Sequence, residues 1–161
     1  HYAATAVAQI SKESDLKLQQ LERAFKTDPS AQNLNKYCDF LGEYLGSGLA
    51  EGRVAQIQRQ QYARLLARRC EREDTLELRI RYASALADVG QIDEAQAVTD
   101  QLVLDVPDEQ EVWMLCLRLA VMRRDGEEVH RVIDAIDKQH VYLSADNREQ
   151  LAFWRDGEEA R

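Results

Sequence analysis

Histidines, cysteines and paired carboxylates are the side chains that could carry chemistry in this sequence. The two interior histidines, His130 and His140, lie ten residues apart and outside any cysteine or carboxylate pattern that would complete a metal site. Cys38, Cys70 and Cys116 fall inside helical patterns without metal-ligand spacing, and an odd number of cysteines does not suit a disulfide framework. We therefore expect the thiols to pack as small apolar groups, His130 to lie on a helix surface, and no catalytic, cofactor or metal site.

Two further patterns that could indicate an enzyme have simpler structural explanations. Residues 46–48 read Gly-Ser-Gly, but they lack the flanking motif of a phosphate-binding loop, and Ser47 lacks the strand-to-helix context of a hydrolase nucleophile. Acidic pairs stand at predicted helix starts, where negative charge offsets unpaired N–H groups. These pairs are Asp93-Glu94, Asp108-Glu109 and Glu127-Glu128. The alternative from a different class, an enzyme or a regulatory appendage of one, would need polar residues that converge in a pocket.

One segment of the sequence is rich in arginine although the chain as a whole is acidic. The net charge of −8 disfavours general binding to nucleic acids or to anionic membranes. Between Gly52 and Cys70, however, there are five arginines and no acidic residue. On a helical wheel, Arg53, Arg64 and Arg68 lie within roughly 60° of one another. This face either pairs with acidic neighbouring helices or docks an acidic segment of a partner protein.

The elements that carry these residues are predicted to be helices throughout. Two prolines and seven glycines in 161 residues, with abundant Ala, Leu, Arg, Gln and Glu, favour an all-α fold. A chain of this length can bury one sizeable core, so we expect a single domain. It contains no run of about 18 apolar residues that could span a bilayer. The start, HYAATAVAQISKE, lacks Met and the features of a signal peptide, as a piece of a longer protein would.

Residues 76–107 form the most regular unit, two amphipathic stretches separated by Gly90 and closed by Pro107. Gly90 can adopt the left-handed conformation that ends a helix. When the chain is shifted so that Ala95 falls on Val129, apolar or small positions of this unit mostly fall on apolar or small positions of the next, without a gap. We predict one domain in five parts: an N-terminal helix over 1–29, an irregular extended hairpin over 30–75, a regular repeat over 76–109, a degenerate repeat over 110–143, and a capping helix over 144–161.

The helix predicted over about residues 50–73 has apolar or small residues on two sides. One side carries a broad apolar arc of Val54, Ile57, Tyr62, Leu65 and Leu66. The opposite side carries Ala63 and Ala67. We therefore expect this helix to pack against two neighbours.

The regular unit resembles a tetratricopeptide repeat (TPR), a helix-turn-helix unit of about 34 residues. Four landmarks of that family fall in one ungapped register: Ala83 at the small eighth position, Gly90 at the inter-helix turn, Ala95 at the nearly invariant alanine, and Pro107 at the closing proline. Arg79 departs from the pattern, because an aromatic residue is usual there. The resemblance implies a TPR-like right-handed α-solenoid of helix-turn-helix hairpins that acts as a protein–protein interaction scaffold.

In this family, the first helices of successive repeats line a concave groove, to which positions two, five, nine and twelve project. In this sequence those positions are Glu77, Ile80, Ser84 and Ala87 in one repeat and Glu111, Met114, Arg118 and Val121 in the next. Apolar contacts with a polar rim could receive a peptide or a helix of a partner protein. The alternative within the same fold is a homo-oligomer formed through the N-terminal helix, which resembles a second helix that lacks its first.

Residues 33–52, NLNKYCDFLGEYLGSGLAEG, carry a second resemblance. They are similar to a segment of the repeat-bearing inner-membrane scaffolds of bacterial Pel exopolysaccharide assembly. The resemblance implies a cytoplasmic domain that is tethered to the inner membrane through a segment outside this chain. Such a domain would assemble other subunits of the biofilm-forming machinery by contact.

Overall fold

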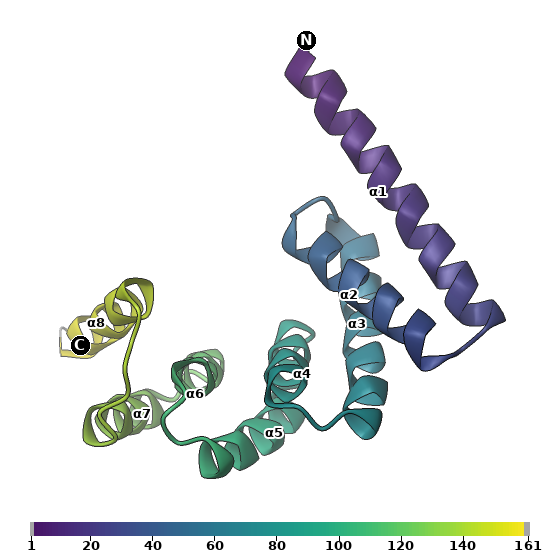
Figure 1. Ribbon diagram of the computed structural model, residues 1–161. Coiled ribbons are helices and arrows are strands. Elements are labelled where there is room, and N and C mark those ends of the chain that lie inside the picture. The colour runs from purple at the N-terminus through teal and green to yellow at the C-terminus, as the bar shows by residue number, and fades with distance from the viewer. Residues whose placement is uncertain (1, 160–161) are drawn as a thin grey trace. The chain divides into compact units, whose positions relative to one another are not determined.

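The computed structural model describes residues 2–159, and all regular secondary structure in that range is α-helical (Figure 1). The helices are α1 (Tyr2–Thr27), α2 (Ala31–Gly46), α3 (Gly52–Arg72), α4 (Leu76–Asp88), α5 (Ile92–Asp105), α6 (Gln110–Met122), α7 (Gly126–Lys138) and α8 (Ala145–Glu159). The all-α prediction is confirmed. The outermost residues of the predicted N-terminal and capping helices, 1 and 160–161, lie outside the described residues.

The chain divides into two compact units, residues 1–73 and 74–161. Helices α1 to α3 belong to the first unit and α4 to α8 belong to the second. The single domain expected from the sequence stays a prediction.

In the N-terminal unit, α2 packs against both α1 and α3. Its start is fixed by Ser30, whose side-chain oxygen accepts a hydrogen bond from the backbone N–H of Asn33 at 3.2 Å. Gly42 in the middle of α2 allows α3 to come close, since a Cβ atom there would lie 2.7 Å from the Tyr62 hydroxyl oxygen. The most deeply buried side chains of this unit include Leu34, Cys38, Leu41, Leu65 and Leu66.

One part of the prediction for α3 is wrong. Val54 and Ile57 were expected in its buried arc, but they are 62% and 59% exposed. Leu65 and Leu66 are buried as expected. Within its unit α3 packs chiefly against α2, and this packing leaves Val54 and Ile57 in the first turns of the apolar arc uncovered.

In the C-terminal unit, each helix from α4 to α7 packs against the next, α8 packs against α7, and α4 also contacts α6. The helix starts repeat as predicted: the step from Leu76 to Gln110, which begin α4 and α6, equals the step from Ile92 to Gly126, which begin α5 and α7. Buried core residues also recur with this spacing. Ala95 and Leu102 of α5 are 0% exposed, and Val129 of α7 is buried at the position that corresponds to Ala95. The predicted repeat is thus present in the packing of the helices.

The turns between these helices use left-handed backbone residues. Gly90 has a φ of 80°, as predicted, and its N–H donates to the Ala87 carbonyl at 3.0 Å. Arg124 stands at the equivalent position of the next hairpin and has a φ of 56°. His140, which follows α7, has a φ of 51°. Both carry a Cβ atom in a region that favours glycine, and this raises the energy of these turns.

Arg79 has a structural role in this unit. Its side chain is 22% exposed, and Nη2 lies 2.5 Å from Oδ2 of Asp105 at the end of α5. The hydrogen bond from Arg79 lowers the pKa of the Asp105 carboxyl. An ion pair therefore joins the two helices of this hairpin at Arg79.

Candidate functional site

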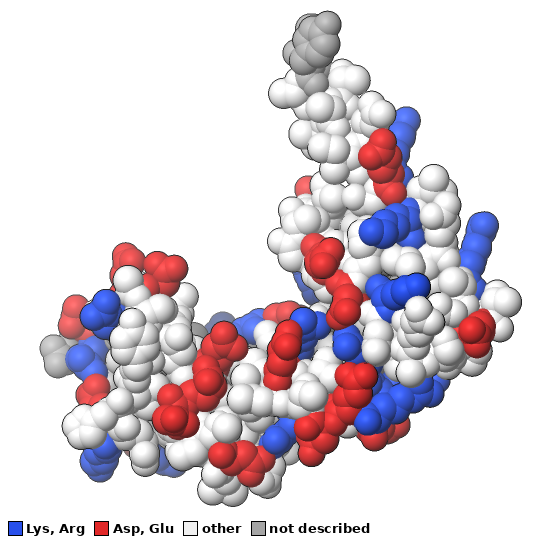
Figure 2. Space-filling view, in the orientation of Figure 1, with Lys and Arg blue, Asp and Glu red and all other residues white. Residues whose placement is uncertain are grey.

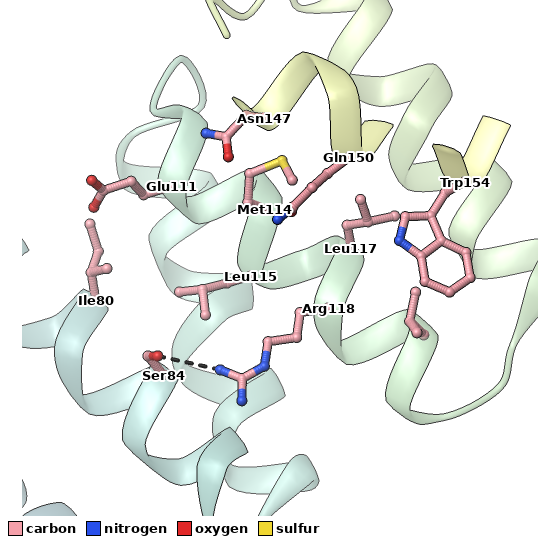
Figure 3. Close-up of a pocket in the computed structure, with 11 residues that line it drawn as sticks. Ile80, Ser84, Glu111, Met114, Leu115, Leu117, Arg118, Asn147, Gln150 and Trp154 are labelled. Carbon is pink, nitrogen blue, oxygen red and sulfur yellow. Dashed lines mark hydrogen bonds between the residues drawn. The ribbon is translucent and has the colours of Figure 1, made fainter. Parts of the chain in front are cut away.

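An open groove of about 620 Å³ lies between α4, α6 and α8 of the C-terminal unit (Figure 3). Its apolar lining comprises Ile80, Met114, Leu115, Leu117, Val121 and Trp154. Its polar lining comprises Ser84, Glu111, Arg118, Asn147 and Gln150. A volume of this size is typical of binding sites, and the mixture of an apolar floor with few polar groups is typical of recognition surfaces.

Six of the residues predicted to face a groove line this one: Ile80, Ser84, Glu111, Met114, Arg118 and Val121. Two do not. Glu77 forms an ion pair with Arg81 on the same helix, at 2.6 Å, and is not part of the lining. Ala87 is 1% exposed and packs in a core cluster with Leu86 and Ala95, because α5 covers that side of α4.

Helix α8 supplies a wall of the groove that the sequence analysis did not predict. Asn147, Gln150 and Trp154 line this side. The side-chain oxygen of Gln110 accepts hydrogen bonds from the Ser144 N–H at 2.8 Å and from Nδ2 of Asn147 at 2.9 Å, which joins the start of α8 to the start of α6. Since Ser144 follows Gln110 by one full repeat, the repeat period could have identified α8 as a further first helix.

Arg118 is the only cation of the groove lining, and its charge is already compensated. Its Nη2 lies 2.5 Å from Oδ1 of Asp88, and its Nη1 donates to the Ser84 hydroxyl at 3.4 Å (Figure 3). These contacts hold the guanidinium against α4. Among the described residues, Glu111 forms no ion pair, so the lining carries one uncompensated negative charge.

The arginine face of α3 consists of Arg53, Arg64 and Arg68, which are all exposed. Within residues 2–159, Arg53 and Arg64 form no ion pair, so pairing with acidic neighbours does not explain them. The Arg68 guanidinium lies over the Phe25 ring, 5.2 Å from its centroid. The exposed Ile57 lies on the same side of the helix, so this surface is basic and partly apolar.

Charge differs strongly between the two units. Residues 1–73 carry eleven Lys or Arg and nine Asp or Glu, whereas residues 74–161 carry ten and twenty, so the net charges are +2 and −10. Acidic side chains are prominent over the C-terminal unit on the face shown in Figure 2. The groove therefore lies in an acidic unit, and the arginine face lies in a weakly basic one.

The residues considered for chemistry are dispersed in the structure. His130 and His140 are exposed, which confirms the predicted surface position of His130. Cys38 and Cys116 are buried, and burial raises the pKa of the Cys116 thiol to about 12, so this thiol stays protonated near neutral pH. In the part of the chain that the structure describes, no group of three or more His, Cys, Asp or Glu could hold a metal ion.

None of the helices described between residues 2 and 159 has both the length and the apolar character needed to cross a membrane. No protein-family model, curated protein or solved structure matches the chain with statistical significance. The groove and the arginine face therefore have to be interpreted from their own geometry.

Proposed function

We propose that this chain is a non-enzymatic protein–protein interaction scaffold of the TPR type, and that its groove receives an amphipathic helix of a partner protein. The observation that carries the proposal is the apolar floor built from α4, α6 and α8, which lies open between polar rim groups. Helix-in-groove recognition needs such a floor for apolar residues at positions i, i+3 or i+4, and i+7 of the ligand. The hydrogen bonds of Arg118 and Gln110 hold the rim in place before binding, which limits the entropic cost.

The charges around the groove define the chemistry of the partner segment. Glu111 is uncompensated, and the unit has a net charge of −10, so a segment that carries Lys or Arg beside its apolar residues fits best. Arg118 is already bound to Asp88, which disfavours capture of a free carboxylate. Met114 can adapt its shape to different apolar side chains, and Trp154 offers a broad aromatic surface.

The first prediction concerns Met114. Changing Met114 to Glu places a carboxylate on the apolar floor, and we expect it to weaken binding of the partner segment about tenfold or more. The segment is identified by photo-crosslinking from a reactive amino acid at Gln150, then synthesised and titrated by fluorescence anisotropy. Leu104→Glu is the matched control, because Leu104 is 76% exposed on α5 and lies outside the groove. Equal affinity of the Met114→Glu variant and the native chain would exclude the groove as the binding site.

The arginine face provides a second docking surface, for an acidic segment of an assembly partner. We expect the Arg53→Glu/Arg64→Glu variant to weaken such binding several-fold at low ionic strength and to lose this difference near 1 M salt, where charges are screened within about 3 Å. Arg68 is left unchanged because it packs on Phe25. Arg59→Glu is the control, since Arg59 is exposed on another side of α3. An Arg59 variant that weakens binding as much as the double variant would mean that only the overall charge matters.

As the cellular setting, we propose the cytoplasmic side of the bacterial inner membrane and the assembly of the Pel exopolysaccharide machinery. The support is the resemblance of residues 33–52, which form most of α2 and the loop after it. The test is co-purification of the tagged chain with membrane subunits of that machinery from a Pel-producing bacterium. If the subunits purify without the chain under gentle extraction, this setting is wrong, while the groove can still be tested by itself.

A further inference from the structure

Helix α1 is much longer than the helix on which it packs. It has 26 residues and α2 has 16, which correspond to lengths of about 39 Å and 24 Å. Because only a short turn joins them, α2 runs back along α1 and ends beside its middle, and the start of α1 projects beyond it (Figure 1). Val7 and Ile10 in this projecting part are 58% and 56% exposed.

A second groove, of about 710 Å³, lies beside the projecting part of α1. One wall consists of Ala3, Ala4, Val7, Ala8 and Ser11, and the other consists of Gly48, Leu49 and Glu51 from the segment between α2 and α3. Residues 2–11 contain no charged side chain, in a chain of which 31% is charged, and Glu51 is the one charged residue in the lining of this groove. The projecting part of α1 is free of charge on the face shown in Figure 2. An uncharged helical segment with exposed Val and Ile is typical of a surface that a partner covers.

The orientation of α1 indicates what kind of element covers it. Val7 precedes Ser14, Leu18 and Phe25 by seven, eleven and eighteen residues, so all four lie along one stripe of the helix. The later part of this stripe is the side that α2 covers, and Leu18 and Phe25 are buried there. A helix antiparallel to α1 that continues the path of α2 would therefore cover the exposed part of this stripe.

We propose that this helix is α1 of a second copy of the chain, so that two copies form a dimer through their projecting ends. A two-fold axis perpendicular to both helices makes them antiparallel, which is the direction that the groove requires. Ala3, Ala4 and Ala8 allow the helices to approach closely. Two copies with a net charge of −8 repel each other, and the uncharged residues 2–11 let the two α1 helices meet without bringing charged side chains of these helices together. The surface is separate from the groove of the C-terminal unit.

Sedimentation equilibrium of the chain at micromolar concentrations tests the dimer. The native chain should show a reversible monomer–dimer equilibrium, and the Val7→Glu/Ile10→Glu variant should dissociate at least tenfold more readily, because carboxylates then meet across the axis. Leu16→Glu is the matched control: Leu16 is 56% exposed on the opposite side of α1, and its variant should dimerise like the native chain. Circular dichroism checks that the helix content is unchanged.

Mixing charge variants tests the two-fold arrangement. The Val7→Glu and Val7→Lys variants should each be mainly monomeric, and their mixture should form a heterodimer, since opposite charges then meet near the axis. A mixture that stays monomeric contradicts this crossing. A native chain that is monomeric at all concentrations, or a dimer that survives Val7→Glu/Ile10→Glu, overturns the proposal. Co-sedimentation of the native chain with phosphatidylcholine vesicles, lost in the double variant, would overturn it in favour of a lipid surface. The Met114→Glu variant should still dimerise, which separates this proposal from the function of the groove.

Discussion

Replacement of Leu102 by alanine should lower the free energy of unfolding of the C-terminal unit by about 3 kcal/mol. Leu102 is 0% exposed and packs with Ala83 of α4 and with Val112 and Leu115 of α6. The shorter side chain would leave a cavity where three helices meet, and the repeat has little freedom to close it. The expected loss combines the lost apolar burial with the cost of this cavity.

Tryptophan fluorescence during urea denaturation measures this effect selectively. Both tryptophans of the chain, Trp113 and Trp154, belong to the C-terminal unit, so their signal reports that unit alone. Leu104→Ala makes the same chemical change two residues later, at a side chain that is 76% exposed, and should cost less than about 0.5 kcal/mol. Similar losses for the two variants would contradict the packing described for α5.

The second large effect is expected in the N-terminal unit, where Asp39 should contribute about 2 kcal/mol through Arg69. The Arg69 side chain is 9% exposed, and its Nη1 lies 2.6 Å from Oδ1 of Asp39. Glu73 is a weaker partner at 3.9 Å, and the Nε atom of Arg69 has no hydrogen-bond partner. Asp39→Ala would leave a largely desolvated cation. We place the loss below the range for fully buried pairs because the Asp39 side chain is 50% exposed.

A second substitution separates the cost of the orphaned charge from a loss of packing. Arg69→Met in the Asp39→Ala background keeps an unbranched side chain in the same space and removes the charge, so it should recover most of the lost stability. Circular dichroism follows both units, and the tryptophan transition should stay unchanged, because Asp39 lies in the other unit. A double variant that is less stable than Asp39→Ala alone would show that Arg69 contributes mainly by packing.

The positions of the helices could be predicted from local signals in the sequence. Which apolar side chains of each helix are buried by a neighbouring helix could not. Gly90 and Pro107 mark the regular hairpin in the sequence, and the structure has α4 and α5 between residues 76 and 105. Val54 and Ile57 follow the helical period as well as Leu66 does, yet only Leu66 is buried. Periodicity shows which side of a helix is apolar, whereas burial depends on whether a neighbour extends far enough to cover it. The projecting part of α1 is exposed for the same reason.

The groove could be predicted in part because it depends on positions within the repeat. Ile80 and Met114 stand at equivalent positions of successive repeats, and both line it. The wall from α8 was missed because the polar composition of this helix indicated an end cap only. The pairing of Arg118 with Asp88 joins residues 30 positions apart and depends on how α6 packs on α4, which no local pattern contains.

The left-handed residues on either side of α7 have a consequence for local unfolding. Arg124 precedes this helix and His140 follows it, both at positive φ without the freedom of glycine. Each conformation costs roughly 1 kcal/mol, and this free energy is recovered when the residue leaves the turn. Opening of the last hairpin therefore releases strain at two points, whereas the hairpin of α4 and α5 turns at Gly90 and stores none there. Amide protons of α7 should accordingly exchange with solvent through partial opening at the ends of the helix. Those of α5 should exchange only when the whole C-terminal unit unfolds.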